Sequence, residues 1–346
     1  MDDVARQPAS ERAELFTEAG ARRGLTPTIL EKDFWVCWIL KRLFSLPGEN
    51  PLLVFKGGTS LSKVYGAIRR FSEDIDLSFD RKDLGYLGER DPESAPSGKK
   101  REQLITDLVA AVEKHIGNVF LPRLNEVIQA QLGRPGVDFD WVLGLDPTAA
   151  QVVIFRYPAP LSRGQYGAAT YINPIVRLEL GARGDAWPTE RHSIWSYAAE
   201  VFPGEFKEPA AEVTVLAAER TFWEKATLLH MEYHRAVKKS PSARSSRHYY
   251  DLALLADTEY GRRALTQLDL LERVAKHKRV YFPAGWAKYE EARPGSLRLV
   301  PPRERLGSLA ADYAKMAPMI FDQRPPRFED LIARIDTLES HINAST

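Results

Sequence analysis

Two aspartates, Asp74 and Asp76, follow a glycine-rich segment, Gly57 to Ser60, after thirteen intervening residues. Side chains two positions apart on a strand share a face, so both carboxylates can converge on hard cations such as Mg²⁺ or Mn²⁺. Glycines let the backbone approach a ligand closely, and a helix that begins there points free N–H groups at an anion. The pattern predicts a phosphate-binding turn beside a site where two metal ions assist a displacement at phosphorus.

Nearby polar residues can complete such a site. The hydroxyls of Thr59 and Ser60 can donate hydrogen bonds to a phosphate. Lys63, on the helix expected after the glycines, can add a phosphate contact, and Lys56, directly before them, can point either way. A third carboxylate is expected as a metal ligand. Glu179 is the best candidate because it lies in an apolar strand pattern, although it can equally be a structural acid.

Local patterns place these residues on a strand, a turn, a helix and a second strand. Residues 52–55 are a short apolar run before the glycines, and residues 61–68 carry apolar side chains at helical spacing after them. In residues 74–79, apolar and polar side chains alternate, as in a strand with one buried face. We therefore expect Asp74 and Asp76 to lie together on the polar face of that strand.

The remaining patterns predict an α+β fold with a mixed sheet. Residues 11–46 are expected to form an N-terminal helical cap, residues 81–100 a polar surface excursion and residues 102–132 a helix. Further strands are expected in residues 137–141, 151–157 and 171–180. After Pro209 the pattern is helical, with helices expected in residues 215–233, 247–256, 265–276, 308–316 and 328–342. We expect two domains, residues 1–205 with the sheet and residues 206–346, which are helical.

Composition excludes several classes of protein. The 48 Lys and Arg residues nearly balance 47 Asp and Glu residues, so a nucleic-acid partner must use a local basic patch. Cys37 is the single cysteine, which excludes an internal disulfide and a multi-thiolate zinc site, and its apolar neighbours predict a buried thiol. We recognise no targeting or membrane-spanning segment, so the cytoplasm is the expected compartment.

A pair of histidines and two clusters of basic residues are weaker candidates for functional sites. His230 and His234 stand four apart on an expected helix, but no third ligand is evident, so we assign no zinc. Two clusters of basic residues are either solvated faces or contacts to RNA, with nearby aromatic side chains available for base stacking. The first cluster is Arg235, Lys238, Lys239, Arg244 and Arg247, and the second is Arg273, Lys276, His277, Lys278 and Arg279 beside Tyr281 and Phe282.

Several ordered motifs resemble the AbiEii/AbiGii toxin family of nucleotidyltransferases, which belongs to the DNA polymerase β-like superfamily. The central match is Lys56-Gly57-Gly58-Thr59-Ser60-Leu61-Ser62-Lys63-Val64-Tyr65-Gly66, followed by Arg70-Phe71-Ser72-Glu73-Asp74-Ile75-Asp76-Leu77. The other matches are Glu31-Lys32-Asp33-Phe34-Trp35, Glu219-Arg220-Thr221-Phe222-Trp223-Glu224-Lys225 and Ser246-Arg247-His248-Tyr249-Tyr250-Asp251-Leu252. The resemblance covers most of residues 25–260.

The resemblance implies a polymerase β-like nucleotidyltransferase core in residues 1–205 and a function as the toxin of an abortive-infection type toxin–antitoxin pair. Such an enzyme moves an NMP from an NTP to an acceptor. In characterised relatives of the MenT type the acceptor is the 3′ end of tRNA, and the modification blocks translation. The implied partners are therefore an NTP, a tRNA and a cognate antitoxin protein.

The resemblance also implies roles for individual residues. By motif position, Asp74 and Asp76 hold metal and are catalytic, and Thr59 or Ser60 contacts phosphate. Lys225 is implied to bind the nucleotide. With the residues argued above from the glycine segment, the candidate nucleotide-binding residues are Lys56, Gly57, Gly58, Thr59, Ser60, Lys63 and Lys225. Lys225 and the late acidic residue Asp251 are also implied to be catalytic.

Three alternatives stay open. Lys225 can pair with Glu224 or Glu232 as a solvated helix residue, and Asp251 can pair with Arg247. The acceptor can be a protein hydroxyl or a small molecule instead of RNA. The chain can also be a nucleotide-binding interaction module that performs no turnover.

Overall fold

The computed structural model describes residues 1–161, 173–236, 239, 243–322 and 324–345. The chain forms two compact units, which are described one at a time: the first comprises residues 1–64, 72–94 and 102–215, and the second comprises residues 65–71, 95–101 and 216–346. Among the described residues, no helix combines the length and the apolar character needed to cross a bilayer.

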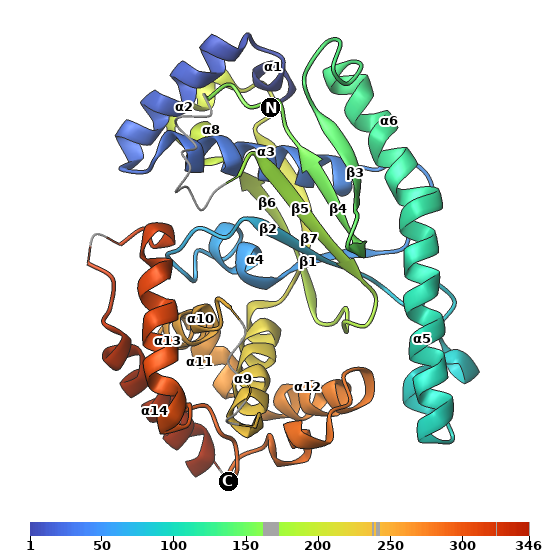
Figure 1. Ribbon diagram of the computed structural model, residues 1–346, viewed down its shortest axis with the longest axis vertical. Coiled ribbons are helices and arrows are strands. Elements are labelled where there is room, and N and C mark those ends of the chain that lie inside the picture. The colour runs from blue at the N-terminus through green and yellow to red at the C-terminus, as the bar shows by residue number, and fades with distance from the viewer. Residues whose placement is uncertain (162–172, 237–238, 240–242, 323, 346) are drawn as a thin grey trace. The chain divides into compact units, whose positions relative to one another are not determined.

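The first unit is built on a mixed seven-stranded sheet in the order β3-β4-β5-β2-β1-β7-β6 (Figure 1). The strands are β1 Leu53–Lys56, β2 Asp74–Phe79, β3 Val142–Asp146, β4 Ala149–Arg156, β5 Ile175–Gly181, β6 Thr189–Trp195 and β7 Ala210–Leu216. β2 is parallel to β5 and β1 is parallel to β7, whereas β1–β2, β3–β4 and β4–β5 are antiparallel. The predicted mixed sheet of an α+β fold is confirmed.

One face of this sheet forms the core of the unit. Ile75, Leu77 and Phe79 are almost fully buried on β2. They alternate with the half-buried Asp74 and Asp76 and with Ser78, which is buried. Trp35 and Trp38 of helix α3 pack on Phe155 of β4, with ring centroids 6.0 and 5.9 Å apart. The apolar side chains of β2 therefore all point to one face, and the polar side chains of β2 must occupy the other.

The helices of the first unit agree with the predicted regions in the N-terminal cap and in residues 102–132. The helix expected in residues 61–68 instead spans Gly57–Lys63, so it begins at the glycines and ends earlier than its apolar spacing indicates. They are α1 Asp2–Ala5, α2 Ala9–Arg23, α3 Pro27–Leu43, α4 Gly57–Lys63, α5 Gly98–His115, α6 Leu121–Leu132 and α8 Tyr197–Val201. The expected helical cap is α2 and α3, which are separated at Gly24 because this glycine ends α2 in the left-handed conformation. A π-helical turn, Ile116–Phe120, joins α5 to α6. Two short 3₁₀ turns, Gly88–Arg90 and Pro92–Ser94, lie in the expected surface excursion.

The second unit is helical. Its helices are α9 Ala218–His234, α10 Ser246–Ala256, α11 Glu259–Leu265, α12 Leu268–Tyr281, α13 Arg303–Met316 and α14 Phe328–Ala344. Residues 65–71 also belong to this unit, although they connect α4 to β2. The Phe71 backbone N–H donates to the carbonyl of Met319 (2.7 Å), and the Phe321 N–H donates to the carbonyl of Arg69 (2.9 Å). The chain therefore enters the second unit just before the aspartate strand.

Two sequence predictions about strands are wrong. Residues 137–141 form a turn, in which the Asp138 carboxylate accepts a hydrogen bond from the Arg134 N–H (2.7 Å), and the strand β3 begins only at Val142. Residues 210–216 form β7, where a helical region was expected, and β6 was not predicted. Ala211, Val213 and Val215 are buried and alternate with more exposed residues, which is the signal of a strand.

One domain boundary and the start of one strand differ from the expected residues. The two compact units divide after Val215, ten residues beyond the expected boundary, because β7 pairs with β1 in the sheet. The expected strand in residues 171–180 is β5, which begins at Ile175. Its first two expected residues, Tyr171 and Ile172, lie outside the described part of the chain.

We expect replacement of Trp35 by alanine to cost about 3–5 kcal/mol in the free energy of unfolding. Its ring is fully buried and stacks on Tyr157 at 5.5 Å, so truncation leaves a cavity on the core face of the sheet. Urea denaturation of both proteins measures the difference. Replacement of Trp195, which is 37% exposed, is the matched control and should cost less than about 1 kcal/mol.

Candidate active site

The glycine turn holds the carboxylate of Asp76. Gly57 follows β1 with φ +83°, a conformation that L side chains rarely adopt. A Cβ atom at Gly57 would lie 2.0 Å from Oδ2 of Asp76, well inside contact distance. The absence of a side chain at Gly57 therefore creates the space that the Asp76 carboxylate occupies. The predicted proximity of the turn and the acidic strand is confirmed for this aspartate.

The hydroxyls of the turn bind the protein itself. Thr59 Oγ1 donates to the backbone carbonyl of Asp74, and Ser60 Oγ donates to the carbonyl of Gly57 (2.9 Å). Both residues are almost fully buried. The Thr59 bond ties the first turn of α4 to the start of β2, and the Ser60 bond lies within that turn, so both hydroxyls stabilise the turn. The first N–H groups of a helix have no intrahelical acceptor, which is the general reason that the start of a helix attracts anions.

The polar face of the sheet carries a row of charged residues on three adjacent strands. Lys56 of β1 is the register partner of Asp76, and Asp76 is in turn the partner of Glu179 on β5. One row away, Asp74 pairs in register with Arg177. The buried side chains of β2 and β5 alternate with these residues, so the four residues of β2 and β5 share the face opposite the core.

The prediction that Asp74 and Asp76 share a face is confirmed, and Glu179 lies beside Asp76 on the neighbouring strand. A ready set of three ligands is not found. Among the described residues, no three His, Cys, Asp or Glu side chains are gathered to hold a metal ion. Mg²⁺ does not require such a cage, since it usually takes one or two protein carboxylates together with substrate phosphates and water. Asp74 and Asp76, both half-buried and with oxygen donors, fit that pattern. The role of Glu179, which is exposed, stays a prediction.

Helix α3 positions both flanks of the motif through buried ion pairs. Nζ of Lys63, at the end of α4, lies 2.8 Å from Oδ1 of Asp33, and the same carboxylate accepts the Tyr197 backbone N–H. Nζ of Lys32 donates to the carboxylate of Glu73, the residue directly before Asp74. Two adjacent residues of one helix therefore hold the end of α4 and the start of β2.

Lys63 consequently has a different setting from the predicted phosphate contact. Only 3% of its side chain is exposed, and Nζ lies 3.6 Å from the centroid of the Tyr197 ring. Burial disfavours the charge on Lys63, but the Asp33 carboxylate outweighs burial and raises the pKa of the ammonium above its usual value. Lys63 is thus a charged residue that is held in a buried ion pair, and its phosphate contact stays a prediction.

Sequence reasoning gave no role to Lys32, Asp33 and Glu73. A usable signal was present, because Lys32 and Asp33 interrupt an apolar helix whose residues 28–40 are all buried. Charged residues are rarely buried unless they are paired. The missing information was the identity of their partners.

The predicted residues Lys225 and Asp251 meet in the second unit. Nζ of Lys225 on α9 lies 2.7 Å from Oδ2 of Asp251 on α10. Arg70 binds the same carboxylate in a bidentate fork, with Nε 2.7 Å from Oδ1 and Nη2 2.8 Å from Oδ2. Burial raises the pKa of Asp251, but the two cations outweigh it and hold that pKa well below its usual range. Asp251 is therefore ionised, and the alternative pairing partners Arg247, Glu224 and Glu232 do not bind these two residues in the described structure.

His248 lies one turn before Asp251 on α10. Its Nδ1 is buried and has no hydrogen-bond partner among the described residues. Burial and the nearby cations Lys225 and Arg247 lower the pKa of its imidazole well below 6.5. The ring is therefore neutral at pH 7.

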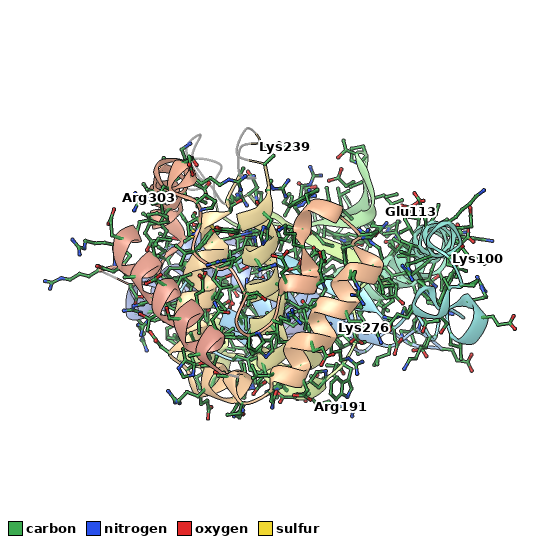
Figure 2. The ribbon with its side chains drawn as sticks, turned by 90° about the horizontal axis from the view of Figure 1, so that it is seen from below. Lys100, Glu113, Arg191, Lys239, Lys276 and Arg303 are labelled. Carbon is green, nitrogen blue, oxygen red and sulfur yellow. The ribbon has the colours of Figure 1, made fainter. Side chains whose placement is uncertain are left out.

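The basic clusters only partly fit an RNA-binding surface. Figure 2 shows Lys239 of the first cluster and Lys276 of the second at separate places on the second unit. Lys238 lies outside the described residues. In the second cluster, His277 and Tyr281 are buried and stack on each other with ring centroids 4.7 Å apart, so the ring of Tyr281 is not accessible to a base.

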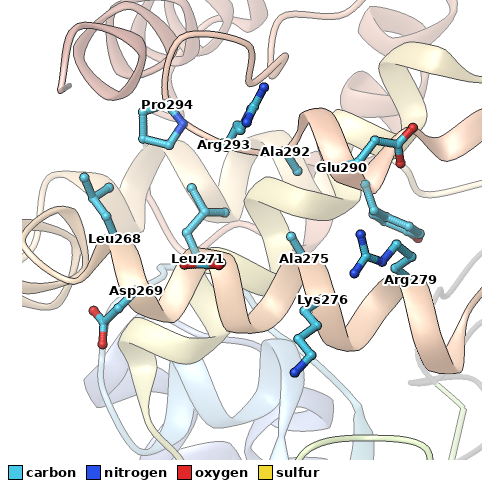
Figure 3. Close-up of a pocket in the computed structure, with 12 residues that line it drawn as sticks. Leu268, Asp269, Leu271, Ala275, Lys276, Arg279, Glu290, Ala292, Arg293 and Pro294 are labelled. Atoms are coloured by element: carbon cyan, nitrogen blue, oxygen red, sulfur yellow. The ribbon is translucent and has the colours of Figure 1, made fainter. Parts of the chain in front are cut away.

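A groove of about 610 Å³ runs along α12 beside the second cluster. Figure 3 shows its apolar floor, which includes Leu271 and Ala275, between charged rims. The rims carry both signs of charge: Lys276, Arg279 and Arg293 against Asp269, Glu272 and Glu290. Balanced charges give this groove no net attraction for a phosphate backbone.

The two unassigned patterns have structural explanations. The ring of His230 uses both nitrogens, one with the carbonyl of Lys288 (3.0 Å) and one with the N–H of Arg298 (3.0 Å). This arrangement requires a proton on Nε2 and a free lone pair on Nδ1, so neither nitrogen is open to a metal. Cys37 is fully buried, and burial raises the pKa of its thiol, which fits a core residue.

Comparison with known proteins identifies the family. Residues 38–334 match the family described as nucleotidyl transferase AbiEii toxin, type IV toxin–antitoxin system. The chain belongs to this family. It is thus a nucleotidyltransferase toxin, which confirms the resemblance seen in its motifs. No curated protein matches the chain.

One solved structure supports the fold of this AbiEii-family toxin. MenT4, a nucleotidyltransferase toxin from Mycobacterium tuberculosis H37Rv, is similar with a TM-score of 0.52 over 96% of this chain and 90% of its own. The two sequences are 17% identical, so the similarity concerns the fold alone. The predicted fold class is confirmed.

We expect Gly57→Ala to reduce nucleotidyl transfer by this toxin about a hundredfold, the loss that a 1 Å displacement of a catalytic group can cause. The new methyl group must displace the Asp76 carboxylate from its position. Transfer from an α-labelled NTP, measured beside the thermal unfolding of both proteins, tests the prediction.

Gly24→Ala is the matched control for backbone strain. Gly24 also has a positive φ, +68°, but a Cβ there would meet no atom within 4 Å. This variant should lose about 1–2 kcal/mol of stability and retain its transfer activity. Equal loss of transfer in both variants would show that strain, and not contact with Asp76, is the cause.

We expect His248→Gln to make the stability of this toxin less dependent on pH below about pH 6.5. In the wild type, the unfolded chain takes up a proton on His248 as the pH falls and the folded chain does not, so acid favours unfolding. The variant should lack this contribution, which is at most about 1.4 kcal/mol per pH unit. Urea denaturation between pH 7 and pH 5 measures it, and replacement of the exposed His341 should change nothing.

Proposed function

We propose that this AbiEii-family toxin transfers an NMP from an NTP to the 3′ end of tRNA in a metal-dependent reaction, and so blocks translation in the cytoplasm. The observation that carries the proposal is the contact of Asp76 with the glycine turn. It brings a metal-binding carboxylate to the N-terminal end of α4, where an anion such as a triphosphate is attracted. Asp74, on the same face, supplies the second carboxylate.

The residues of the first unit have distinct tasks in this proposal. Asp74 and Asp76 bind the divalent ion and thereby orient the phosphates. The N–H groups at the start of α4 bind phosphate oxygens, while Thr59 and Ser60 hold the turn in shape. Lys56, in register with Asp76 and half-buried, is available to neutralise a phosphate. A bound Mg²⁺ or Mn²⁺ would lower the pKa of the attacking hydroxyl and offset the charge of the leaving pyrophosphate.

In the second unit, we assign nucleotide binding to Lys225. Its ammonium is held by Asp251, and of the three groups in that cluster it has the largest exposed side-chain fraction, 9% against 4% for Arg70 and 0% for Asp251. An ammonium fixed in this way can meet a phosphate without losing further side-chain freedom. Asp251 acts through Lys225 in this proposal.

Two features support an RNA acceptor. They are the likeness of the motifs to tRNA-modifying relatives and the exposed cations such as Lys239 and Lys276 on the second unit. The net charge of +1 gives no general attraction for RNA, so recognition must rely on local contacts. The acceptor therefore needs a direct assay.

The test is incubation of the protein with Mg²⁺, each α-labelled NTP and total RNA. We expect label at the 3′ ends of tRNA with the wild type. Asp76→Asn should reduce transfer about a hundredfold to a thousandfold, as when one electrostatic stabiliser of a transition state is removed. Asp140→Asn, at a side chain that is 86% exposed, is the control and should transfer as the wild type does.

The destination of the label separates the alternatives. Label in the protein fraction or in a soluble product would replace tRNA by another acceptor. A wild type that binds NTP but transfers no label to any fraction would favour an interaction module without turnover. Full transfer by Asp76→Asn would overturn the catalytic assignment.

A further inference from the structure

Two cations share one buried carboxylate in the second unit. Arg70 forms the bidentate fork to Asp251, and Lys225 binds Oδ2 of the same carboxylate. Asp251 is completely buried, and its two partners have side-chain exposures of 4% and 9%. The guanidinium cannot lose its proton in a protein, so the three groups carry a net positive charge if Lys225 is protonated.

A buried net charge is unfavourable, and the cations that act on Lys225 outnumber the anions. The charged groups that act on Lys225 are Asp251, Arg70 and Arg247, which are two cations and one anion. Burial, together with Arg70 and Arg247, outweighs Asp251 and lowers the pKa of Lys225 below its usual value. The cluster therefore gains from any anion that reaches the exposed part of Lys225.

We propose that Arg70 is a positioning residue that occupies most of the Asp251 carboxylate and so keeps the Lys225 ammonium un-neutralised for the triphosphate of the NTP. This inference rests on the proposed function of Lys225. A simple Lys225–Asp251 pair would have no net charge and would attract a phosphate weakly. When Arg70 also binds Asp251, the carboxylate still fixes Lys225 in place. Its single negative charge is then shared by two cations, so the cluster keeps a net positive charge.

The geometry favours this division of tasks. Arg70 makes two of the three ionic contacts to Asp251, and planar guanidinium–carboxylate forks are strong and directional. The backbone of the Arg70 segment is also fixed, because residues on both sides of it bond to Met319 and Phe321. Arg70 therefore cannot move toward a ligand, whereas Lys225 can donate from its exposed edge.

The test is the affinity of the full-length protein for ATP, GTP, CTP and UTP, and for inorganic tripolyphosphate, measured by calorimetry with Mg²⁺. Arg70→Met should raise the Kd about tenfold, which corresponds to about 1.4 kcal/mol. Arg69→Met is the matched control because Arg69 is 68% exposed and pairs with Asp322, not Asp251. It should bind within about twofold of the wild type.

A double variant separates charge from structure. Arg70→Met combined with Asp251→Asn again leaves one net positive charge, on Lys225, and should restore the Kd to within about threefold of the wild type. Arg70→Lys keeps the charge without the fork and should also bind within about threefold. If Arg70 had only a structural role, the double variant would bind no better than Arg70→Met, since it lacks more of the hydrogen bonds.

Thermal unfolding of each variant shows whether it is folded, and a second variant replaces Arg70→Met if that protein does not fold. If Arg70→Met does not fold, Arg70→Gln provides the test, because it removes the charge, keeps hydrogen-bond donors for Asp251 and should raise the Kd for tripolyphosphate about tenfold. An unchanged Kd in a folded Arg70→Gln variant would overturn the inference. A wild type that binds no NTP would instead refute the proposed function, whereas wild-type transfer with unchanged affinity in Arg70→Met would refute this inference alone.

Discussion

The contact between a carboxylate and a glycine is the constraint on which the first unit depends. Asp76 can occupy its position only because Gly57 has no side chain, and Gly57 can adopt its positive φ for the same reason. The strand order then follows as a requirement: β1 must lie beside β2 so that the end of one faces the start of the other. The hydroxyls of Thr59 and Ser60, although buried, serve this contact by keeping the turn tight.

Buried ion pairs from helix α3 fix the position of the segment that carries the glycines and the two aspartates. α3 binds Lys63 and Glu73, on the two sides of the motif, with neighbouring residues. Such pairs contribute little net stability, because desolvation offsets most of their attraction, but loss of one partner leaves an uncompensated charge. Their main effect is to fix the alignment of α3 against the motif, because each pair defines which residue of α3 faces which residue of the motif. A core of apolar residues alone would tolerate a shift more easily.

Local features of the site could be predicted from the sequence, and distant partners could not. The common face of Asp74 and Asp76 follows from a two-residue period, and the turn follows from two glycines after an apolar run. The pairing of Lys63 with Asp33 joins residues 30 apart, and that of Arg70 with Asp251 joins residues 181 apart. Charge alone does not select one partner from the 47 acidic residues of the chain. The strand β7 is not predicted for a different, local reason. Its short alternating pattern directly precedes a strong helical pattern, which dominates the interpretation of residues 210–216.

The path of residues 65–71 limits how the two units can be exchanged by recombination. The chain leaves the first unit between its glycine turn and its aspartate strand, contributes this short segment to the second unit and then returns. No single cut in the gene separates the two units cleanly. A recombination between family members that exchanged only the C-terminal helices would join an Arg70 from one parent to an Asp251 from the other. The two units are therefore expected to evolve as one module.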